Sequence, residues 1–160
     1  MGYTIRRIET KDNRRVEEII RSCLIEFGGD HEGTAWTDPD LGRFFELYQK
    51  EKTAYWVAED ENGVVVGGVG IGELPGVART CELQKMYCVP SVRGKGLAAR
   101  LLDEALAFAL RYYDRCYLET LPSMKQAHRF YEKSGFYRVA EALTETEHGA
   151  CDVRYLKKLK

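Results

Sequence analysis

Residues 96 to 113 carry a wide apolar stripe at helical spacing, which is the strongest secondary-structure signal in the chain. The stripe consists of Leu97, Leu101, Leu102, Ala105, Leu106, Ala109 and Leu110. Directly before it, residues 80–89 have the pattern of a strand that Pro90 ends. A strand that runs through a short glycine-containing loop into a long amphipathic helix indicates a protein in which a sheet and helices share one core.

The rest of the chain continues this mixture of patterns. Strands are predicted over residues 3–8, 54–59, 64–73, 115–120, 136–140 and 151–159, and helices over 13–27, 41–48 and 124–133. Asp38-Pro39 has the form of an N-cap followed by a first helical proline, and Ser123 has the form of an N-cap for the helix over 124–133. Gly135 stands where a left-handed glycine would end that helix. The order β-α-α-β-β-β-α-β-α-β-β predicts one mixed α/β domain over residues 1–160.

Charge and cysteine usage exclude several functions. Lys and Arg total 24 against 25 Asp and Glu, so the net charge of −1 gives no field that attracts nucleic acid or an anionic membrane. The five cysteines form no C-x-x-C pair and the three histidines lack zinc-ligand spacing, so no metal is expected. The absence of a signal-peptide pattern and of a long apolar run predicts a cytoplasmic protein.

The loop around Gly94 and Gly96 is the clearest ligand-binding signal. It follows a strand and opens a helix, so the unpaired N–H groups of the first helical turn and the helix dipole favour an anion there. Arg93 and Lys95 add full positive charges nearby, which makes a phosphate or pyrophosphate the natural ligand. The competing interpretation is a plain connection with solvated basic residues.

A dinucleotide is the alternative ligand, because Gly94-x-Gly96-x-x-Ala99 also satisfies the G-x-G-x-x-A fingerprint, with Glu119 near the distance expected for the ribose-binding acid. That fold places its fingerprint at the first strand-to-helix turn and needs several βα units after it. Only one further helix follows here, so a dinucleotide-binding oxidoreductase-like domain stays the less favoured alternative.

The segment Arg93-Gly94-Lys95-Gly96-Leu97-Ala98 resembles the Gln/Arg-x-x-Gly-x-Gly/Ala signature of the GNAT superfamily of N-acetyltransferases. Residues 82–90, 117–121 and 127–136 extend the resemblance in the right order and spacing. It implies the GNAT fold, a central, mixed but mostly antiparallel sheet of about seven strands flanked by about four helices. It also implies transfer of an acetyl group from acetyl-CoA to a primary amine of a small molecule or peptide, by direct attack in a ternary complex.

The resemblance further implies roles for individual residues. Acetyl-CoA would be held by the strand residues Met86, Tyr87 and Cys88, by Tyr131, and by the loop residues Arg93, Gly94, Lys95, Gly96, Leu97, Ala98 and Ala99. Tyr131 would donate a proton to the departing thiolate, and Glu82 or Glu119, or both together, would serve as general base. Read as structure alone, Tyr131 is a packed aromatic and each glutamate is a strand carboxylate paired with a cation.

The resemblance also leads to expectations for one CoA contact and for the entrance of the acceptor site. Many members of the superfamily have a CoA-contacting asparagine where Met124 stands, and methionine cannot donate that hydrogen bond, so Ser123 is a candidate replacement. The expected acceptor mouth carries the acidic and aromatic residues His31, Glu32, Trp36, Asp38, Glu73, Glu141, Glu145 and Glu147, which suits a cationic amine. A homodimer is compatible with the sequence, and a non-catalytic CoA-binding module is the second alternative function.

Overall fold

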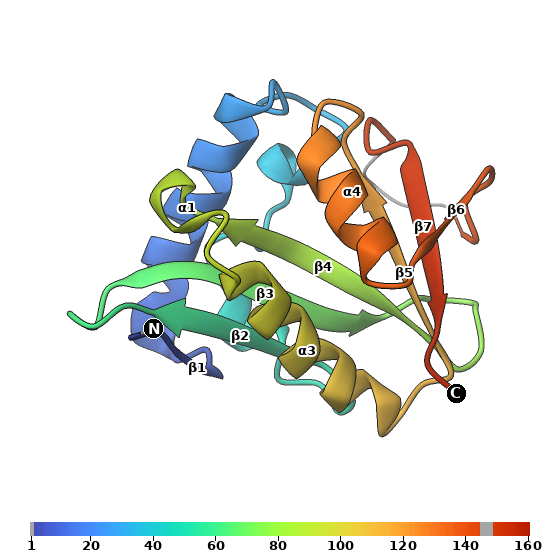
Figure 1. Cartoon of the computed structure of the whole chain (residues 1–160), viewed down its shortest axis with the longest axis horizontal. Coiled ribbons are helices and arrows are strands. Elements are labelled where there is room, and N and C mark those ends of the chain that lie inside the picture. The colour runs from blue at the N-terminus through green and yellow to red at the C-terminus, as the bar shows by residue number, and fades with distance from the viewer. Residues whose placement is uncertain (1, 145–148) are drawn as a thin grey trace.

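The computed structural model describes residues 2–144 and 149–160 and contains one seven-stranded sheet with helices on both faces (Figure 1). The elements are β1 (Thr4–Arg7), α1 (Asn13–Glu26), α2 (Phe44–Leu47), β2 (Ala54–Glu59), β3 (Val65–Glu73), β4 (Thr80–Cys88), α3 (Leu97–Leu110), β5 (Arg115–Thr120), α4 (Lys125–Lys133), β6 (Tyr137–Val139) and β7 (Val153–Lys158). The predicted order of strands and helices is confirmed.

The strands lie in the order β1-β2-β3-β4-β5-β7-β6, and every neighbouring pair is antiparallel except β4 and β5. A dinucleotide-binding fold needs a run of parallel strands joined by crossover helices. Here one parallel pair, connected through α3, is embedded in an antiparallel sheet, so the topology disfavours the oxidoreductase-like alternative.

Alternate residues of the central strands supply two separate hydrophobic cores. Trp56 packs on the face covered by α3 and α4, whereas its neighbours Tyr55 and Val57 pack on the face covered by α1 and α2. All three side chains are buried, so β2 is covered on both sides. The two helical layers fix the positions of β4 and β5 from both faces, and these strands carry the candidate site.

The predicted start of the second helix is wrong. Asp38-Pro39 does not begin a helix; α2 begins at Phe44, and Asp38 lies in extended backbone at the end of a 3-10 turn, Ala35–Thr37. The first turn of α2 is capped instead by Asn13 at the start of α1, whose Oδ1 accepts a hydrogen bond of 2.8 Å from the backbone N–H of Phe45. A cap that comes from a residue so distant in sequence leaves no local signal.

The predicted cap of α4 is also wrong. Ser123 Oγ donates a hydrogen bond of 2.7 Å to the carbonyl of Phe27, and Met124 occupies the N-cap position. At the other end, Gly135 adopts the expected left-handed conformation, with φ of 94°. The turn after α4 therefore follows the prediction, whereas the turn before it is tied to the end of α1.

Candidate active site

The site lies where β4 and β5 separate. Their parallel pairing joins Thr80–Glu82 to Arg115–Tyr117, and within the described residues β4 forms no further pairs with β5 after Glu82. The rest of β4 pairs only with β3 on its other side. One backbone edge of β4, from Gln84 onward, is therefore open to a ligand.

A bulge interrupts β4 within this open stretch. Gly68 pairs with Tyr87 and Gly70 pairs with Gln84, so Lys85 and Met86 together lie opposite Val69. Lys85 adopts a φ of 51°, in the left-handed region that costs a non-glycine residue about 1–2 kcal/mol. The hydroxyl of Tyr55 donates a hydrogen bond of 2.9 Å to the Lys85 carbonyl, which stabilises this conformation.

Glycines in β3 make room for the side chains that reach β4. A Cβ on Gly68 would lie 2.7 Å from the ring of Tyr55, and a Cβ on Gly70 would lie 2.8 Å from the Tyr48 hydroxyl. The Tyr48 hydroxyl donates a hydrogen bond of 2.6 Å to Gln84 Oε1. The sequence analysis did not identify Tyr48 or Tyr55 as residues that shape the site. The alternating glycines of β3 were a signal for them, because they leave room for large side chains across this strand.

A first cavity, of about 350 Å³, lies beside the glycine loop. It contains most of the residues predicted to hold acetyl-CoA, namely Met86, Tyr87, Cys88, Arg93, Gly94, Gly96, Ala98, Ala99 and Tyr131. Gly94 and Gly96 have φ values of 75° and 82°, and the space where their Cβ atoms would stand is open. Of the other predicted residues, Lys95 is exposed outside the lining and Leu97 is 1% exposed in the core.

The side chain of Arg93 is engaged within the protein. Its guanidinium contacts Glu26 at 2.6 and 2.9 Å and donates to the Cys88 carbonyl at 3.1 and 2.9 Å, so it ties α1 to the end of β4. The hydrogen bond from Arg93, which outweighs the effect of partial burial, lowers the pKa of Glu26. Arg93 therefore also shapes the wall of the cavity.

Tyr131 lies in the same cavity, 7% exposed, on the side of α4 that faces the sheet. Its ring packs against Phe130, Phe136 and Tyr155, and in the described part of the chain its hydroxyl makes no hydrogen bond. Burial raises the pKa of the Tyr131 phenol, so the hydroxyl keeps its proton at neutral pH. Among the described residues, no other side chain forms a hydrogen bond with this hydroxyl.

Ser123, which follows β5, was a candidate to replace the CoA-contacting asparagine of other superfamily members. Its orientation differs from that expectation. Because its hydroxyl donates to Phe27, Ser123 is turned away from the lining of the cavity. Met124 and Gln126 line it instead, and the Gln126 amide is a hydrogen-bonding group that sequence reasoning missed.

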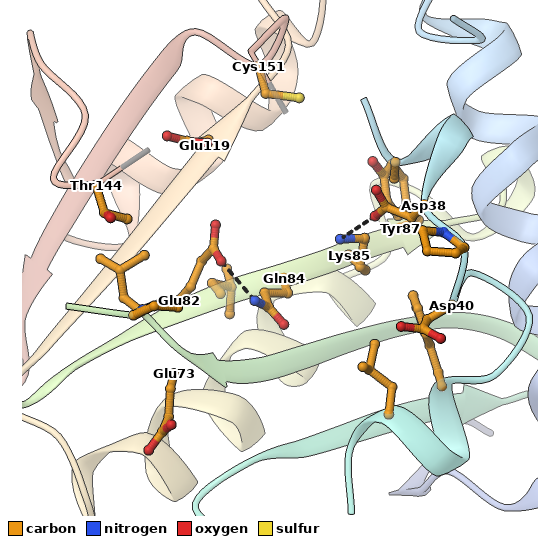
Figure 2. Close-up of a pocket in the computed structure, with 17 residues that line it drawn as sticks. Asp38, Asp40, Glu73, Glu82, Gln84, Lys85, Tyr87, Glu119, Thr144 and Cys151 are labelled. Carbon is orange, nitrogen blue, oxygen red and sulfur yellow. Dashed lines mark hydrogen bonds and ion pairs between the residues drawn. The ribbon is translucent and has the colours of Figure 1, made fainter. Parts of the chain in front are cut away.

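A second cavity, of about 730 Å³, contains both predicted candidate bases (Figure 2). Glu82 comes from β4 and Glu119 from β5, on the two strands that separate. Tyr87 lines both cavities, which therefore meet at the open edge of β4. An acyl donor in one cavity and an acceptor in the other would adjoin at this tyrosine.

The two glutamates have different surroundings. Glu119, 5% exposed, accepts a hydrogen bond of 2.6 Å from the Tyr117 hydroxyl, and its Oε2 lies 3.9 Å from Arg154 Nε. Glu82 is also partly buried, and its Oε1 accepts a hydrogen bond of 2.8 Å from Gln84 Nε2. The described contacts of Glu119 thus include a guanidinium, whereas the described hydrogen bond to Glu82 comes from a neutral amide.

The predicted acidic mouth is only partly present at this cavity. Asp38 and Glu73 line it, whereas His31, Glu32, Trp36 and Glu141 are outside the lining, and Glu145 and Glu147 lie outside the described residues. Asp40, Lys85 and Cys151 line it without having been predicted. Lys85 had no sequence signal because its place depends on the bulge.

Comparison with known proteins agrees with this geometry. The sequence model of the Acetyltransferase (GNAT) family matches residues 14–136. The chain belongs to this family. It is 42% identical over 158 residues to the Escherichia coli (strain K12) protein named Uncharacterized N-acetyltransferase YjgM, covering 97% of this chain and 94% of that protein. This GNAT protein is therefore an acyltransferase enzyme of the N-acetyltransferase class.

Solved structures show the same fold. A GNAT-family acetyltransferase from Staphylococcus aureus Mu50 superimposes with a TM-score of 0.86 at 22% identity, covering 99% of each chain. A phosphinothricin acetyltransferase from Sinorhizobium meliloti, solved in complex with AcCoA, gives a TM-score of 0.77 at 21% identity, covering 99% of this chain and 89% of that one. The predicted GNAT fold is confirmed.

The described residues contain no helix that is long and apolar enough to cross a membrane. They also contain no group of three or more His, Cys, Asp or Glu side chains that could hold a metal ion.

Proposed function

We propose that this GNAT enzyme transfers the acetyl group of acetyl-CoA to a primary amine of a small molecule or peptide, by direct attack in a ternary complex. The observation that carries the proposal is the meeting of two cavities at Tyr87, beside the open edge of β4. One cavity contains the residues expected to hold the donor, and the other contains two carboxylates suited to receive a proton.

Several features of the smaller cavity support acetyl-CoA as the donor. Gly94 and Gly96 leave open space at the N-terminus of the 14-residue helix α3, where backbone N–H groups and the helix dipole favour a pyrophosphate. The open edge of β4 at Met86–Cys88 can pair with an extended arm, and a backbone N–H there can polarise a carbonyl oxygen. When bound, acetyl-CoA supplies the thioester; the chain's own residues orient it and move the protons.

Glu82 is the base that we assign to the acceptor amine. Its carboxylate lines the acceptor cavity four residues before Met86, and the Gln84 amide orients it by donating a hydrogen bond to Oε1. Glu119 Oε2 already accepts a hydrogen bond from the Tyr117 hydroxyl and lies 3.9 Å from Arg154 Nε, so we give this carboxylate the secondary role. Glu119 would then hold the acceptor's ammonium group before Glu82 takes the proton.

Tyr131 is the acid that we assign to the departing thiolate. Its neutral hydroxyl lies in the donor cavity with no hydrogen bond to the described residues, so it can donate to a sulfur atom without first breaking an internal contact. The ring contacts with Phe136 and Tyr155 fix its orientation.

The test combines binding with turnover. Acetyl-CoA is expected to raise the melting temperature of the protein and NADPH to leave it unchanged, because the donor cavity fits the former. Release of free CoA thiol is then followed with a panel of amino acids, amino acid amides, diamines and lysine peptides. Stabilisation by NADPH alone would contradict the proposed donor. Stabilisation by acetyl-CoA without release of CoA by any amine would favour a non-catalytic binding module instead.

A further inference from the structure

Lys85 brings a positive charge into a cavity whose charged lining is otherwise acidic. Among the described residues that line the acceptor cavity it is the one cation, against Asp38, Asp40, Glu73, Glu82 and Glu119. Its side chain is 14% exposed, and its ammonium lies 3.2 Å from Asp38 Oδ2 (Figure 2). A lysine ammonium has three donors, so the contact with Asp38 leaves capacity for a second anion.

The acidic excess of the cavity is smaller than its lining suggests. Asp38 is paired with Lys85, Asp40 with Arg43 at 3.2 Å, and Glu119 with Arg154 at 3.9 Å. Three of the five carboxylates therefore have a basic group within 4 Å. The cavity presents charges of both signs, which is a poorer match for a purely cationic acceptor than for one that carries both charges.

The backbone fixes where the positive charge stands. Lys85 occupies the left-handed residue of the β4 bulge, and Tyr55 holds its carbonyl at 2.9 Å. It follows Glu82 by three residues on the same strand, and both side chains line the same cavity. A ligand whose amine is directed to Glu82 can therefore direct a neighbouring anionic group to Lys85.

We infer that Lys85 is a specificity-determining residue and that the acceptor is a compound with a carboxylate close to its reactive amine, as in an amino acid. The acceptor's carboxylate binds the Lys85 ammonium beside Asp38, while the amine lies at Glu82. This inference rests on the proposed function, since it names the acceptor class for the same site.

The test compares each L-amino acid with its carboxamide, which keeps the amine and removes the negative charge. The ratio of kcat/KM for acid over amide is measured for the wild type, Lys85→Met and Lys85→Arg. Lys85→Met should lower this ratio at least about tenfold, the effect of losing one charge-assisted hydrogen bond, and Lys85→Arg should lower it less. Comparing ratios between enzymes cancels the difference in amine pKa between acid and amide.

A double variant controls for folding. Lys85→Met alone leaves Asp38 beside a neutral side chain, whereas Asp38→Asn/Lys85→Met removes both charges, and it should show the same loss of preference for acids. An unchanged ratio in both variants, or wild-type kcat/KM values that are higher for putrescine and cadaverine than for every amino acid, would overturn the inference and leave acetyl transfer intact. Failure of every amine in the panel to release CoA would overturn the proposed function, and the inference with it.

Discussion

Gln84 Nε2 donates a hydrogen bond of 2.8 Å to Glu82 Oε1, and this contact sets the orientation of the carboxylate that we assign as base. Gln84 Oε1 in turn accepts a hydrogen bond of 2.6 Å from the Tyr48 hydroxyl. Because Tyr48 is buried, the chain from Tyr48 through Gln84 to Glu82 connects the core of the α1 face to the acceptor cavity. The base is thus positioned by Gln84, which lines the acceptor cavity, and through it by Tyr48, which is not part of the lining.

Replacing this base should reduce turnover. Glu82→Gln keeps the size of the side chain and removes its capacity to take a proton, so kcat should fall by about 10² to 10⁴. Glu73→Gln, which changes another carboxylate of the same cavity, should lower kcat less than about threefold, since a solvent-exposed strand end makes a poor base. A large loss of kcat in Glu119→Gln, combined with a small one in Glu82→Gln, would assign the base to Glu119 instead.

Removing the Tyr131 hydroxyl should affect chemistry more than binding. Tyr131→Phe keeps the ring contacts and the fold, so acetyl-CoA should still raise the melting temperature, while kcat should fall by about 10² or more. Because burial raises the pKa of this phenol, its proton should not be lost across neutral pH, and kcat should show no fall from its ionisation below about pH 10. The matched variant Tyr137→Phe removes a hydroxyl from an exposed tyrosine of β6. Equal turnover in both variants would refute the role of Tyr131.

The glycine loop permits a control that separates backbone strain from ligand binding. Gly94 and Gly63 have φ values of 75° and 77°, and neither has an atom within 4 Å of its expected Cβ. Alanine should therefore cost each position a similar free energy of unfolding, about 1 kcal/mol. Only Gly94→Ala should also raise the KM for acetyl-CoA, because a methyl group there obstructs the approach of a phosphate. Equal KM values for acetyl-CoA in the two variants would exclude close contact of the pyrophosphate with Gly94.

The elements that follow from local sequence were predicted well. The apolar stripe after Gly96 is α3, and β2 and β5 have the predicted bounds, because periodicity and turn residues act within a few neighbours. The wrong N-caps predicted for α2 and α4 have a common cause. In each, a polar side chain bonds a distant backbone group, Asn13 to Phe45 and Ser123 to Phe27.

The residues of the candidate site were predicted only in part, because long-range contacts also decide which side chains line the cavities. Glu82, Glu119 and Tyr131 were predicted as site residues from the resemblance of their surrounding motifs, and they line the two adjoining cavities. Lys85 was not found, because its place in the cavity depends on a bulge that Tyr55 stabilises from another strand. Pairing register and long-range side-chain hydrogen bonds of this kind are tertiary properties that one sequence does not display.

Asp12 provides a test of stability away from the site. It is 4% exposed and accepts two hydrogen bonds from Arg6, at 2.8 and 3.0 Å, and one from the Glu9 N–H. Burial alone would raise the pKa of Asp12, but these hydrogen bonds lower it overall. A carboxyl whose pKa is lower in the folded state stabilises the protein above its unfolded pKa, about 3.9, and loses that effect as the pH falls through the folded value.

Asp12→Asn should therefore cost about 1–3 kcal/mol in urea unfolding at pH 7 and clearly less at pH 3. The control Asp103→Asn, on the exposed face of α3, should cost little at either pH. A cost for Asp12→Asn that stays the same at both pH values would mean that packing, and not the charge of Asp12, stabilises this corner.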